Sequence, residues 1–391
     1  MNRLILHPGH DRRARGGHPW IFSNEINSFD EEPSAGDALE VASHSGEFLG
    51  IAYFNPHSLI AARILSRQKE SIDTVDFFRR RITAALDYRH RLYGPEEALR
   101  VVYGEGDQLP GLVVDRYGKV LSVQFLTLGM ERRRDLVLEA LVDIFRPAAI
   151  VARNDVAVRE LEGLPCAVEL LHGEIPEPLI MKEHGLQFRV DVLGGQKTGH
   201  FLDQKENHQA LNGRVEGGRV LDLFCYSGSW SVHAARYGAD EVTGSDSSPT
   251  ALALAEENVR LNGLESKCSF VRADAFELLR DLGRSGERYR TIILDPPAFV
   301  KSKKKLQEAI KGYLTINRRA MELLTPGGHL FSCTCSHHLD RETFLDTLRK
   351  AASQSGRTIR LVEMRGQSYD HPVLLSCPET EYLKCAVLQA L

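Results

Sequence analysis

The feature that most constrains the fold of this chain is a regular alternation of strand and helix patterns, which begins near Gly218 and runs to the C-terminus. Short apolar segments are each followed by an amphipathic stretch of helical period. The predicted strands are RVLDLFCY, EVTGSD, CSFVRAD, TIILDPP, HLFSCTCS, TIRLVEMRG and YLKCAVLQAL. Such alternation predicts a parallel α/β sheet covered on both faces, in which an antiparallel last strand is allowed.

The first half of the chain has a different pattern. Residues 1–71 hold short strand-like segments separated by Gly, Pro and Ser, which predicts a small all-β domain. Residues 72–185 combine amphipathic helices with several strands, which predicts a small α+β domain. The α/β domain then spans residues 186–391, and 391 residues are enough for three domains.

Composition narrows the class of protein. The chain is 42% hydrophobic and 26% charged, as in globular proteins, and no run of about 20 apolar residues predicts a membrane span. Seven scattered cysteines do not form a disulfide pattern, so we expect the reducing cytoplasm. The net charge of −4 hides two basic patches, one with Arg13 and Arg15, the other with Lys301, Lys303 and Lys304. Either patch could bind RNA phosphates or form a solvated face.

Aspartates stand at the ends of three successive predicted strands: Asp246, Asp274 and Asp295. Ligands of open α/β sheets bind outside the carboxyl ends of the strands. Asp246 is placed to accept hydrogen bonds from two ribose hydroxyls, and Asp274 is placed to reach an adenine amino group. Each aspartate alone could be a helix N-cap instead. The loop after the first strand contains Gly228 but lacks the GxGxxG pattern, which argues against a dinucleotide site.

Two cysteines lie in the predicted strand HLFSCTCS. Side chains alternate along a strand, so Cys333 and Cys335 are expected to share a face. A CxC without a second CxxC pair does not predict a zinc site, and no metal site is expected. Two interpretations stay open from the residues alone: a pair of inert buried thiols, or a reactive cysteine.

These features together resemble a class I S-adenosylmethionine-dependent methyltransferase over residues 190–391. The resemblance implies a Rossmann-like seven-stranded sheet and S-adenosylmethionine as cofactor. It places Asp246 near the ribose and Asp274 near the adenine. The implied cofactor-binding residues in this part of the chain are Phe224, Tyr226, Ser227, Gly228, Asp246, Ser247, Asp274, Ala275 and Asp295.

More specific motifs extend the resemblance to the whole chain. They are HPWIFSNEI, GEGDQLPGLVVDRYG, GGQKTGHFLDQKENH, DPPAFVKSKKKLQEAIKGY, SCTCS and YDHPVLLSCPETEYLK. In this order they resemble the RlmI-like family of bacterial 23S ribosomal RNA 5-methylcytosine methyltransferases. That family implies an N-terminal PUA domain for RNA, a central domain and a catalytic domain.

The resemblance also places the segment QKTGHFLDQ as a flap near the cofactor and the target base. Gln196, Thr198 and Phe201 would then contact the cofactor, and Lys197 would contact RNA, with Asp203 a further candidate. Such a polar cluster could instead only cap the first helix of the domain. His371, in YDHPV, could be structural or could line the RNA site.

The implied reaction has a chemical need for cysteine. C5 of cytosine is a poor nucleophile until a thiolate adds to C6, which is covalent catalysis. The Ser/Thr-Cys-Ser/Thr pattern of such families favours Cys335 over Cys333 as the nucleophile, and Asp295 could reach N3 of the base. The position after Pro297 holds no cysteine, so another base must remove the C5 proton.

Two alternatives remain. An RNA N-methyltransferase acting on a purine would place an aromatic residue directly after Pro-Pro to stack on the flipped base, whereas Ala298 intervenes before Phe299. A catalytically silent RNA-binding protein that keeps the cofactor fold would not need Cys335. Large-subunit ribosomal RNA is the expected partner, no membrane partner is expected, and monomer and homodimer both stay open.

Overall fold

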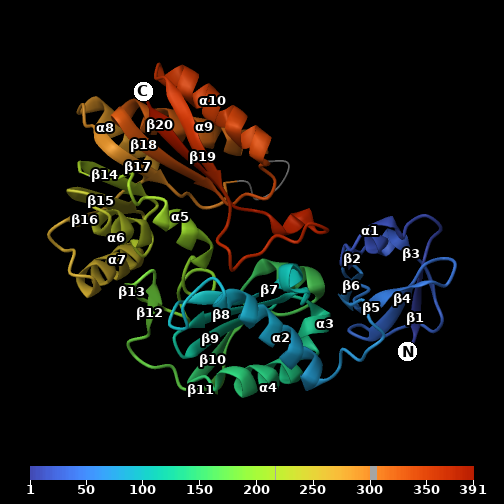
Figure 1. Cartoon of the computed structure of the whole chain (residues 1–391). Helices are drawn as coiled ribbons and strands as arrows, with labels where there is room; N and C mark the ends of the chain where they lie inside the picture. The colour runs from blue at the N-terminus through green and yellow to red at the C-terminus, as the bar shows by residue number, and fades with distance from the viewer. Residues whose placement is uncertain (216, 300–305) are drawn as a thin grey trace. The chain divides into compact units, whose positions relative to one another are not determined.

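The computed structural model describes residues 1–215, 217–299 and 306–391 (Figure 1). The chain divides into two compact units, neither of which is continuous in sequence. The first contains residues 1–182, 190–202 and 369–380, and the second contains residues 183–189, 203–368 and 381–391. Among the described residues, no helix is long and apolar enough to cross a membrane.

The first unit contains two sheets. A six-stranded sheet has the order β2-β6-β5-β4-β1-β3 and is built from β1 (Arg3–Leu6), β2 (Trp20–Ile21), β3 (Ile26–Phe29), β4 (Ala38–Ala42), β5 (Phe48–Phe54) and β6 (Ala62–Ser66). A five-stranded sheet has the order β11-β10-β9-β8-β7 and is built from β7 (Leu99–Tyr103), β8 (Leu112–Tyr117), β9 (Val120–Phe125), β10 (Ala149–Arg153) and β11 (Val168–Gly173). Strand β12 (Ile180–Glu183) leads into the second unit.

Helices of the first unit are α1 (Arg12–Arg15), α2 (Val75–His90), α3 (Leu128–Glu131) and α4 (Arg134–Phe145). Helix α2 begins where the Thr74 hydroxyl accepts the Phe77 N–H at 3.2 Å, which satisfies one of the free N–H groups at the helix start. Its buried face, with Phe77, Phe78 and Ile82, packs in the core of the five-stranded sheet.

The second unit is one seven-stranded sheet with the order β16-β15-β14-β17-β18-β20-β19. Its strands are β14 (Arg219–Leu223), β15 (Glu241–Asp246), β16 (Cys268–Arg272), β17 (Tyr289–Leu294), β18 (Leu324–Thr334), β19 (Ile359–Arg365) and β20 (Lys384–Ala390). Strands β14 to β18 pair in parallel, and β20 runs antiparallel between β18 and β19. The expected class I methyltransferase sheet with an antiparallel last strand is thereby confirmed.

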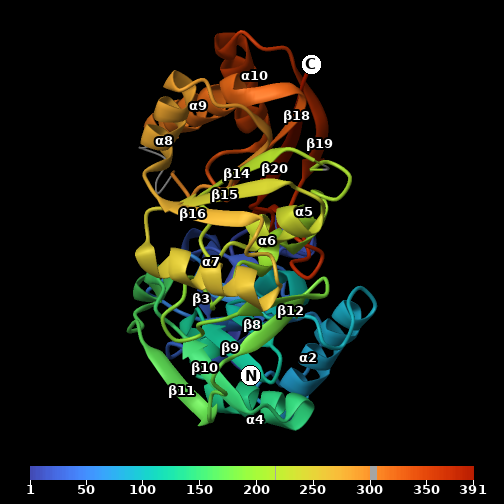
Figure 2. The same ribbon diagram turned by 90° about the vertical axis from the view of Figure 1, so that its left-hand side faces the viewer.

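Helices cover both faces of this sheet (Figure 2). They are α5 (Lys205–Gln209), α6 (Ser229–Arg236), α7 (Pro249–Leu261), α8 (Ala275–Arg284), α9 (Leu306–Leu323) and α10 (Arg341–Ser355), and β13 (Leu186–Arg189) packs on α7. Successive strand residues point to opposite faces. Ile292 and Leu330 therefore join the core under α8, α9 and α10, while Ile293 and Phe331 join the core under α5 and α6.

Several predicted strand bounds differ from the structure, and two of the strands bear on the site. The first strand ends at Leu223, not at position 226, because Phe224 takes the left-handed backbone angle φ 65°. Strand β18 begins at Leu324, so the TPGG segment extends the strand, and it ends at Thr334. The argument that placed Cys333 and Cys335 on one strand face therefore does not hold, since Cys335 lies beyond the strand.

Candidate active site

The loop after β14 has an unusual backbone conformation. Phe224, Tyr226 and Gly228 have φ angles of 65°, 46° and 75°, all in the left-handed region that L side chains rarely adopt. A Cβ on Gly228 would lie 2.9 Å from the Cβ of Ala255. The loop therefore needs glycine at this position for packing as well as for backbone angle.

Asp246 holds this loop from the end of β15. Its Oδ2 accepts the N–H of Tyr226 at 3.1 Å, and its Oδ1 accepts the N–H of Ser248 at 2.9 Å. A carboxylate oxygen can accept more than one hydrogen bond. Asp246 thus fixes the loop and still has acceptor capacity for the two hydroxyls of a ribose.

Asp274 caps helix α8. Its Oδ1 accepts the N–H groups of Phe276 and Glu277 at 2.9 and 3.0 Å. The capping interpretation is correct for this oxygen, and it leaves the exposed carboxylate able to accept from a ligand. Capping and ligand contact are therefore compatible for this residue.

Two side chains fix Asp295 just beyond β17. Gln204 Nε2 donates to Oδ1 at 2.9 Å, and the indole Nε1 of Trp230 donates to Oδ2 at 3.0 Å. Hydrogen bonds to an ionised carboxylate are stronger than neutral ones. The half-buried carboxylate of Asp295 is therefore held in one orientation at the carboxyl edge of the sheet.

A second carboxyl group, Asp222, lies inside the sheet in β14. It is fully buried, and this burial, reinforced by the negative charge of Asp295, raises its pKa to about 7 from an ordinary value of 3.8. The hydroxyl of Ser231 donates to Oδ2 at 2.6 Å and opposes part of that rise. Within the described residues, Oδ1 has no hydrogen-bond partner.

The two cysteines of the CxC pair have different surroundings. Cys333 is fully buried in β18 opposite Cys385 of β20, in the apolar core with Phe331 and Val387. Burial raises the pKa of its thiol well above the ordinary value, so the thiol stays protonated. Cys335 is half-buried and follows the last residue of the strand, Thr334.

Polar groups surround the segment that carries Cys335. The hydroxyl of Thr334 donates to the Tyr313 hydroxyl at 2.8 Å. The ammonium of Lys384 donates to the carbonyls of Ser336 and Tyr382, both at 2.9 Å. Burial lowers the pKa of Lys384, and the nearby acids Glu381 and Asp340, together with the Cys335 sulfur when it is ionised, oppose part of that fall. A cation is therefore close enough to stabilise a thiolate at Cys335.

Several predicted residues lie in the first unit. Thr198 is buried, donates to Asp115 Oδ2 at 2.5 Å and lies 3.0 Å from the Tyr117 hydroxyl. The ammonium of Lys197 lies 4.4 Å from the centre of the Phe201 ring. The roles predicted for this flap, Gln196 included, stay predictions. Asp203 belongs to the second unit, where its Oδ2 accepts the Tyr382 hydroxyl at 2.6 Å.

The predicted RNA-binding arginines make ion pairs with acids. Arg15 contacts Asp11 at 2.5 Å and Glu47 at 2.7 Å, and Arg13 lies 3.8 Å from Glu379. Both guanidinium groups keep solvent exposure, so RNA binding stays a prediction for them. Lys301, Lys303 and Lys304 lie outside the described residues.

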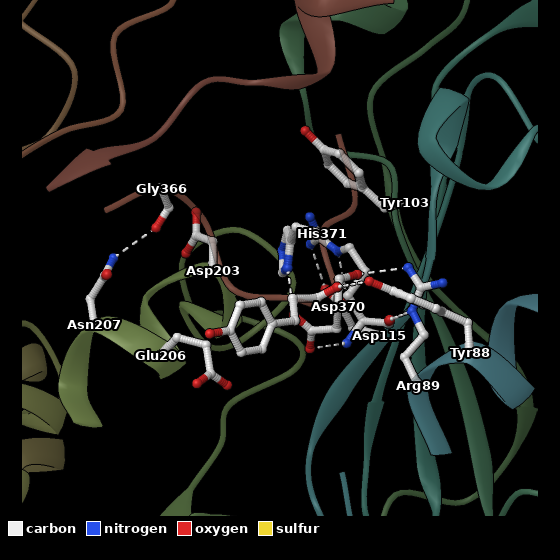
Figure 3. Close-up of polar contacts among 12 residues, drawn as sticks. Tyr88, Arg89, Tyr103, Asp115, Asp203, Glu206, Asn207, Gly366, Asp370 and His371 are labelled. Carbon is white, nitrogen blue, oxygen red and sulfur yellow. Dashed lines mark hydrogen bonds and ion pairs between the residues drawn. The ribbon is translucent and has the colours of Figure 1, made fainter. Parts of the chain in front are cut away.

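His371 is buried in the first unit, where it and its neighbour Asp370 fix the position of this chain segment through side-chain and backbone contacts (Figure 3). The backbone carbonyl of Asp370 accepts a hydrogen bond from the Arg89 guanidinium at 2.7 Å. The side-chain Oδ1 of Asp370 lies 2.7 Å from His371 Nδ1. The ring of His371 packs 5.2 Å from that of Tyr103. These contacts are those expected of a structural histidine, and a contact of His371 with RNA stays a prediction.

Sequence reasoning did not name four residues that support the site: Gln204, Trp230, Tyr313 and Lys384. Gln204 stands in the flap motif and Trp230 directly follows the glycine loop, so both lay in segments already singled out. Tyr313 and Lys384 carry no local signal, because they reach Thr334 and Ser336 from a helix and a strand distant in sequence.

Comparisons with known proteins identify the family and the fold. A family profile for an S-adenosylmethionine-dependent methyltransferase matches residues 127–371, and one for a PUA-like domain matches residues 4–67. The "Ribosomal RNA large subunit methyltransferase I" of Shewanella denitrificans is 40% identical over 387 residues, which cover 98% of each chain.

Two solved structures have the same fold over their full length. One is a Streptococcus mutans protein assigned as a SAM-dependent methyltransferase, with 23% identity, full coverage of both chains and a TM-score of 0.84. The other is a protein assigned as a methyltransferase and complexed with SAH, with 22% identity, full coverage of both chains and a TM-score of 0.86.

Proposed function

Because this chain belongs to the ribosomal RNA large subunit methyltransferase I family, we propose that it forms 5-methylcytosine in 23S ribosomal RNA through a covalent bond between Cys335 and C6 of the target cytosine. The chain is a S-adenosylmethionine-dependent methyltransferase with a PUA-like domain before its catalytic fold. Cytosine as the base and cysteine as the nucleophile are the parts that this proposal adds.

The observation that carries the proposal is the contrast between the two cysteines. Cys333 is a fully buried core thiol with a raised pKa, whereas Cys335 is half-buried beyond the strand end with Lys384 nearby. A thiolate, and not a thiol, is the attacking species. The surroundings therefore favour Cys335 as the nucleophile.

The strand register supports a shared site for Cys335 and Asp295. Leu294 of β17 pairs with Ser332 of β18, so Asp295 follows one strand end while Cys335 follows the adjacent one. With its carboxylate fixed by Gln204 and Trp230, Asp295 is suited to bind the N3 edge of the base. For this the Asp295 carboxyl takes up a proton with the base and donates it to N3, which neutralises the negative charge that develops on the ring when sulfur adds to C6; the proton returns when the sulfur leaves.

The reaction then follows from these groups. The Cys335 thiolate bonds to C6, which turns C5 into an enamine-like carbon that can attack an electrophilic methyl group. Bound S-adenosylmethionine supplies that methyl group on its sulfonium. A base takes the C5 proton, the C5–C6 double bond returns, and the sulfur leaves as a thiolate. Lys384 stabilises the thiolate before attack and after release.

The loop at Gly228 with Asp246 fits the cofactor that the family uses. Left-handed backbone angles at Phe224, Tyr226 and Gly228 make a tight turn at the carboxyl end of β14, and Asp246 beside it keeps acceptor capacity for a ribose. The PUA-like domain supplies RNA binding in this proposal, and the target base is flipped into the catalytic domain. The proposal includes a cytoplasmic location, because the substrate is ribosomal RNA.

The test is methyl transfer from labelled S-adenosylmethionine to ribosomal RNA isolated from a strain without this protein, with the product nucleoside identified by mass. Wild type, Cys335→Ala and Cys333→Ala are compared, the last being the matched control. We expect 5-methylcytosine from wild type and from Cys333→Ala, and a loss of at least about 10³-fold with Cys335→Ala, as for other covalent nucleophiles.

RNA that carries 5-fluorocytosine sharpens the test, because fluorine at C5 cannot leave as a proton and the covalent complex accumulates. Wild type and Cys333→Ala should form a denaturation-resistant complex, and Cys335→Ala should not. A methylated purine as product, with both variants active, would refute the proposal and favour N-methylation. Cofactor binding without any methylated RNA would indicate the silent RNA-binding protein.

Phe299 gives a further reason to favour cytosine over a purine. Its ring is partly buried against the core near helix α9, with its centroid 4.7 Å from that of Tyr313 and 6.1 Å from that of Phe276. An aromatic residue that stacks on a flipped purine must instead present a free ring face.

A further inference from the structure

We propose that Glu183, His208 and His233 bind one first-row transition-metal ion, with Zn²⁺ the best match. The three side chains come from the end of β12, from α5 and from α6, and all belong to the second unit. One potential ligand atom of each lies within 4.8 Å of the other two. The inference goes beyond the proposed function and does not depend on it.

The three side chains are almost completely removed from solvent. Glu183 and His233 are 0% exposed, and His208 is 1% exposed. Glu183 Oε1 lies 2.6 Å from His208 Nδ1 and 3.5 Å from His233 Nε2. A single carboxylate oxygen therefore faces one nitrogen of each imidazole in a water-poor interior.

His233 has one nitrogen committed and one without a partner. Nδ1 lies 2.8 Å from the Ser229 carbonyl, which can only accept, so this nitrogen carries the proton. Among the described residues, Nε2 has no hydrogen-bond partner, although it is buried and faces Glu183. In a neutral ring, a nitrogen lone pair then faces a carboxylate oxygen, which is unfavourable unless a cation lies between them.

The surroundings keep that ring neutral. The side chain of His233 is 0% exposed, and removal from water disfavours a charged imidazolium. Phe188 and His208 stack on it at centroid distances of 5.8 and 4.8 Å. The apolar ring of Phe188 helps to exclude water from the three side chains, and a hydrophobic shell of this kind controls solvent access to a metal site.

The chemistry of the ligands selects the kind of ion. Two imidazole nitrogens and a carboxylate oxygen suit Zn²⁺ and its first-row neighbours, and they suit Ca²⁺ or Mg²⁺ poorly. Zinc ligands at about 2.0–2.1 Å lie roughly 3.3 Å apart in a tetrahedral site. The 3.5 Å distance between Glu183 Oε1 and His233 Nε2 already fits this value. The 2.6 Å distance between Glu183 Oε1 and His208 Nδ1 must increase as the ion replaces the Nδ1 proton, which is released.

A second group of residues of metal-ligand type has no counterpart to the unpartnered Nε2 of His233. His18, Cys377 and Glu379 also converge, but the guanidinium of Arg13 lies 2.8 Å from His18 Nε2. A cation is thus already present there. Of these two clusters, the one around His233 has a nitrogen lone pair and a carboxylate oxygen facing each other without a cation between them.

An ion at this site would stabilise the arrangement of elements in the second unit. His233 stands in α6, which begins directly after the Gly228 loop, and His208 follows Gln204 by one turn. The ring of His208 packs edge-on at 4.7 Å against Trp230, whose indole donates to Asp295. The metal would therefore join the elements that hold Asp295 and the glycine loop in place.

The test uses the full chain without a histidine tag, purified without chelator, dialysed against ZnCl₂ and then against metal-free buffer. Elemental mass spectrometry measures bound metal, and the thermal unfolding midpoint is recorded with and without added Zn²⁺. His208→Asn and His233→Gln test the ligands. His329→Gln is the matched control, since His329 is a buried histidine of the same unit outside the cluster.

We expect about one zinc ion per chain in wild type and in His329→Gln, and at least about tenfold less in the two ligand variants. Added Zn²⁺ should raise the unfolding midpoint of wild type but not of His233→Gln, because it binds only the folded state. Wild type that holds no stoichiometric metal and shows no midpoint shift overturns the proposal without any variant. Full zinc retention in the folded variants, verified by circular dichroism, overturns it as well.

Discussion

The buried carboxyl of Asp222 makes the stability of the second unit depend on pH. The perturbation is Asp222→Asn, which replaces a titrating group by a neutral one of the same shape. Burial raises the pKa of Asp222 from 3.8 to about 7, so the folded state holds a proton that the unfolded chain has already released between these values. Stability must therefore fall as pH rises from about 4 to about 7, and the loss is complete above pH 7.

The magnitude follows from this difference. Each pKa unit corresponds to about 1.4 kcal/mol, so the whole shift amounts to roughly 4 kcal/mol. Between pH 5 and pH 8 the wild-type unit should lose roughly 2–3 kcal/mol through this group alone. Asp222→Asn should lack that loss. Any constant cost of a buried amide cancels, because the comparison is between two pH values of the same variant.

The assay exploits the two tryptophans, Trp20 and Trp230. In a Trp20→Phe background, fluorescence of Trp230 follows the second unit alone during urea unfolding at pH 5 and pH 8. Ser231→Ala is the matched control: it removes the hydrogen bond that lowers the pKa of Asp222, so the pH-dependent loss should remain and move to higher pH. If Asp222→Asn loses as much stability as wild type between pH 5 and pH 8, the argument from burial is refuted.

Three further predictions concern the active site. Gly228→Ala should weaken cofactor binding, measured by calorimetry, about tenfold or more. A left-handed backbone costs alanine about 1–2 kcal/mol, and the contact of its Cβ with helix α7 adds to that cost; an unchanged affinity would show that the loop adapts. Trp230→Phe should lower kcat/KM about 10- to 100-fold, since a hydrogen bond to charged Asp295 is worth about 1.5–3 kcal/mol, and an unchanged rate would mean that Gln204 suffices. Lys384→Gln should move the rise of the Cys335 adduct rate to higher pH, whereas a slower rate with an unmoved pH profile would indicate a purely structural lysine.

The order of elements in the second unit could be predicted from the sequence because its signals are local. Apolar runs, helical period and the aspartates at strand ends are properties of short segments, and parallel strands separated by helices leave few arrangements. The bounds were less predictable. The left-handed backbone angle of Phe224 ends β14 at Leu223, and β18 ends at Thr334; no composition rule encodes either bound.

What the sequence determined by itself is therefore the fold class, the place of the loop at Gly228 and the presence of a cysteine pair near a strand end. Only the tertiary structure decided which cysteine is buried, because burial depends on β20 and the helices that cover β18. The same holds for the neutral carboxyl of Asp222, for the supports of Asp295 and for the Glu183–His208–His233 cluster. Each depends on side chains that are distant in sequence, and a group's charge state follows from the neighbours that replace water around it.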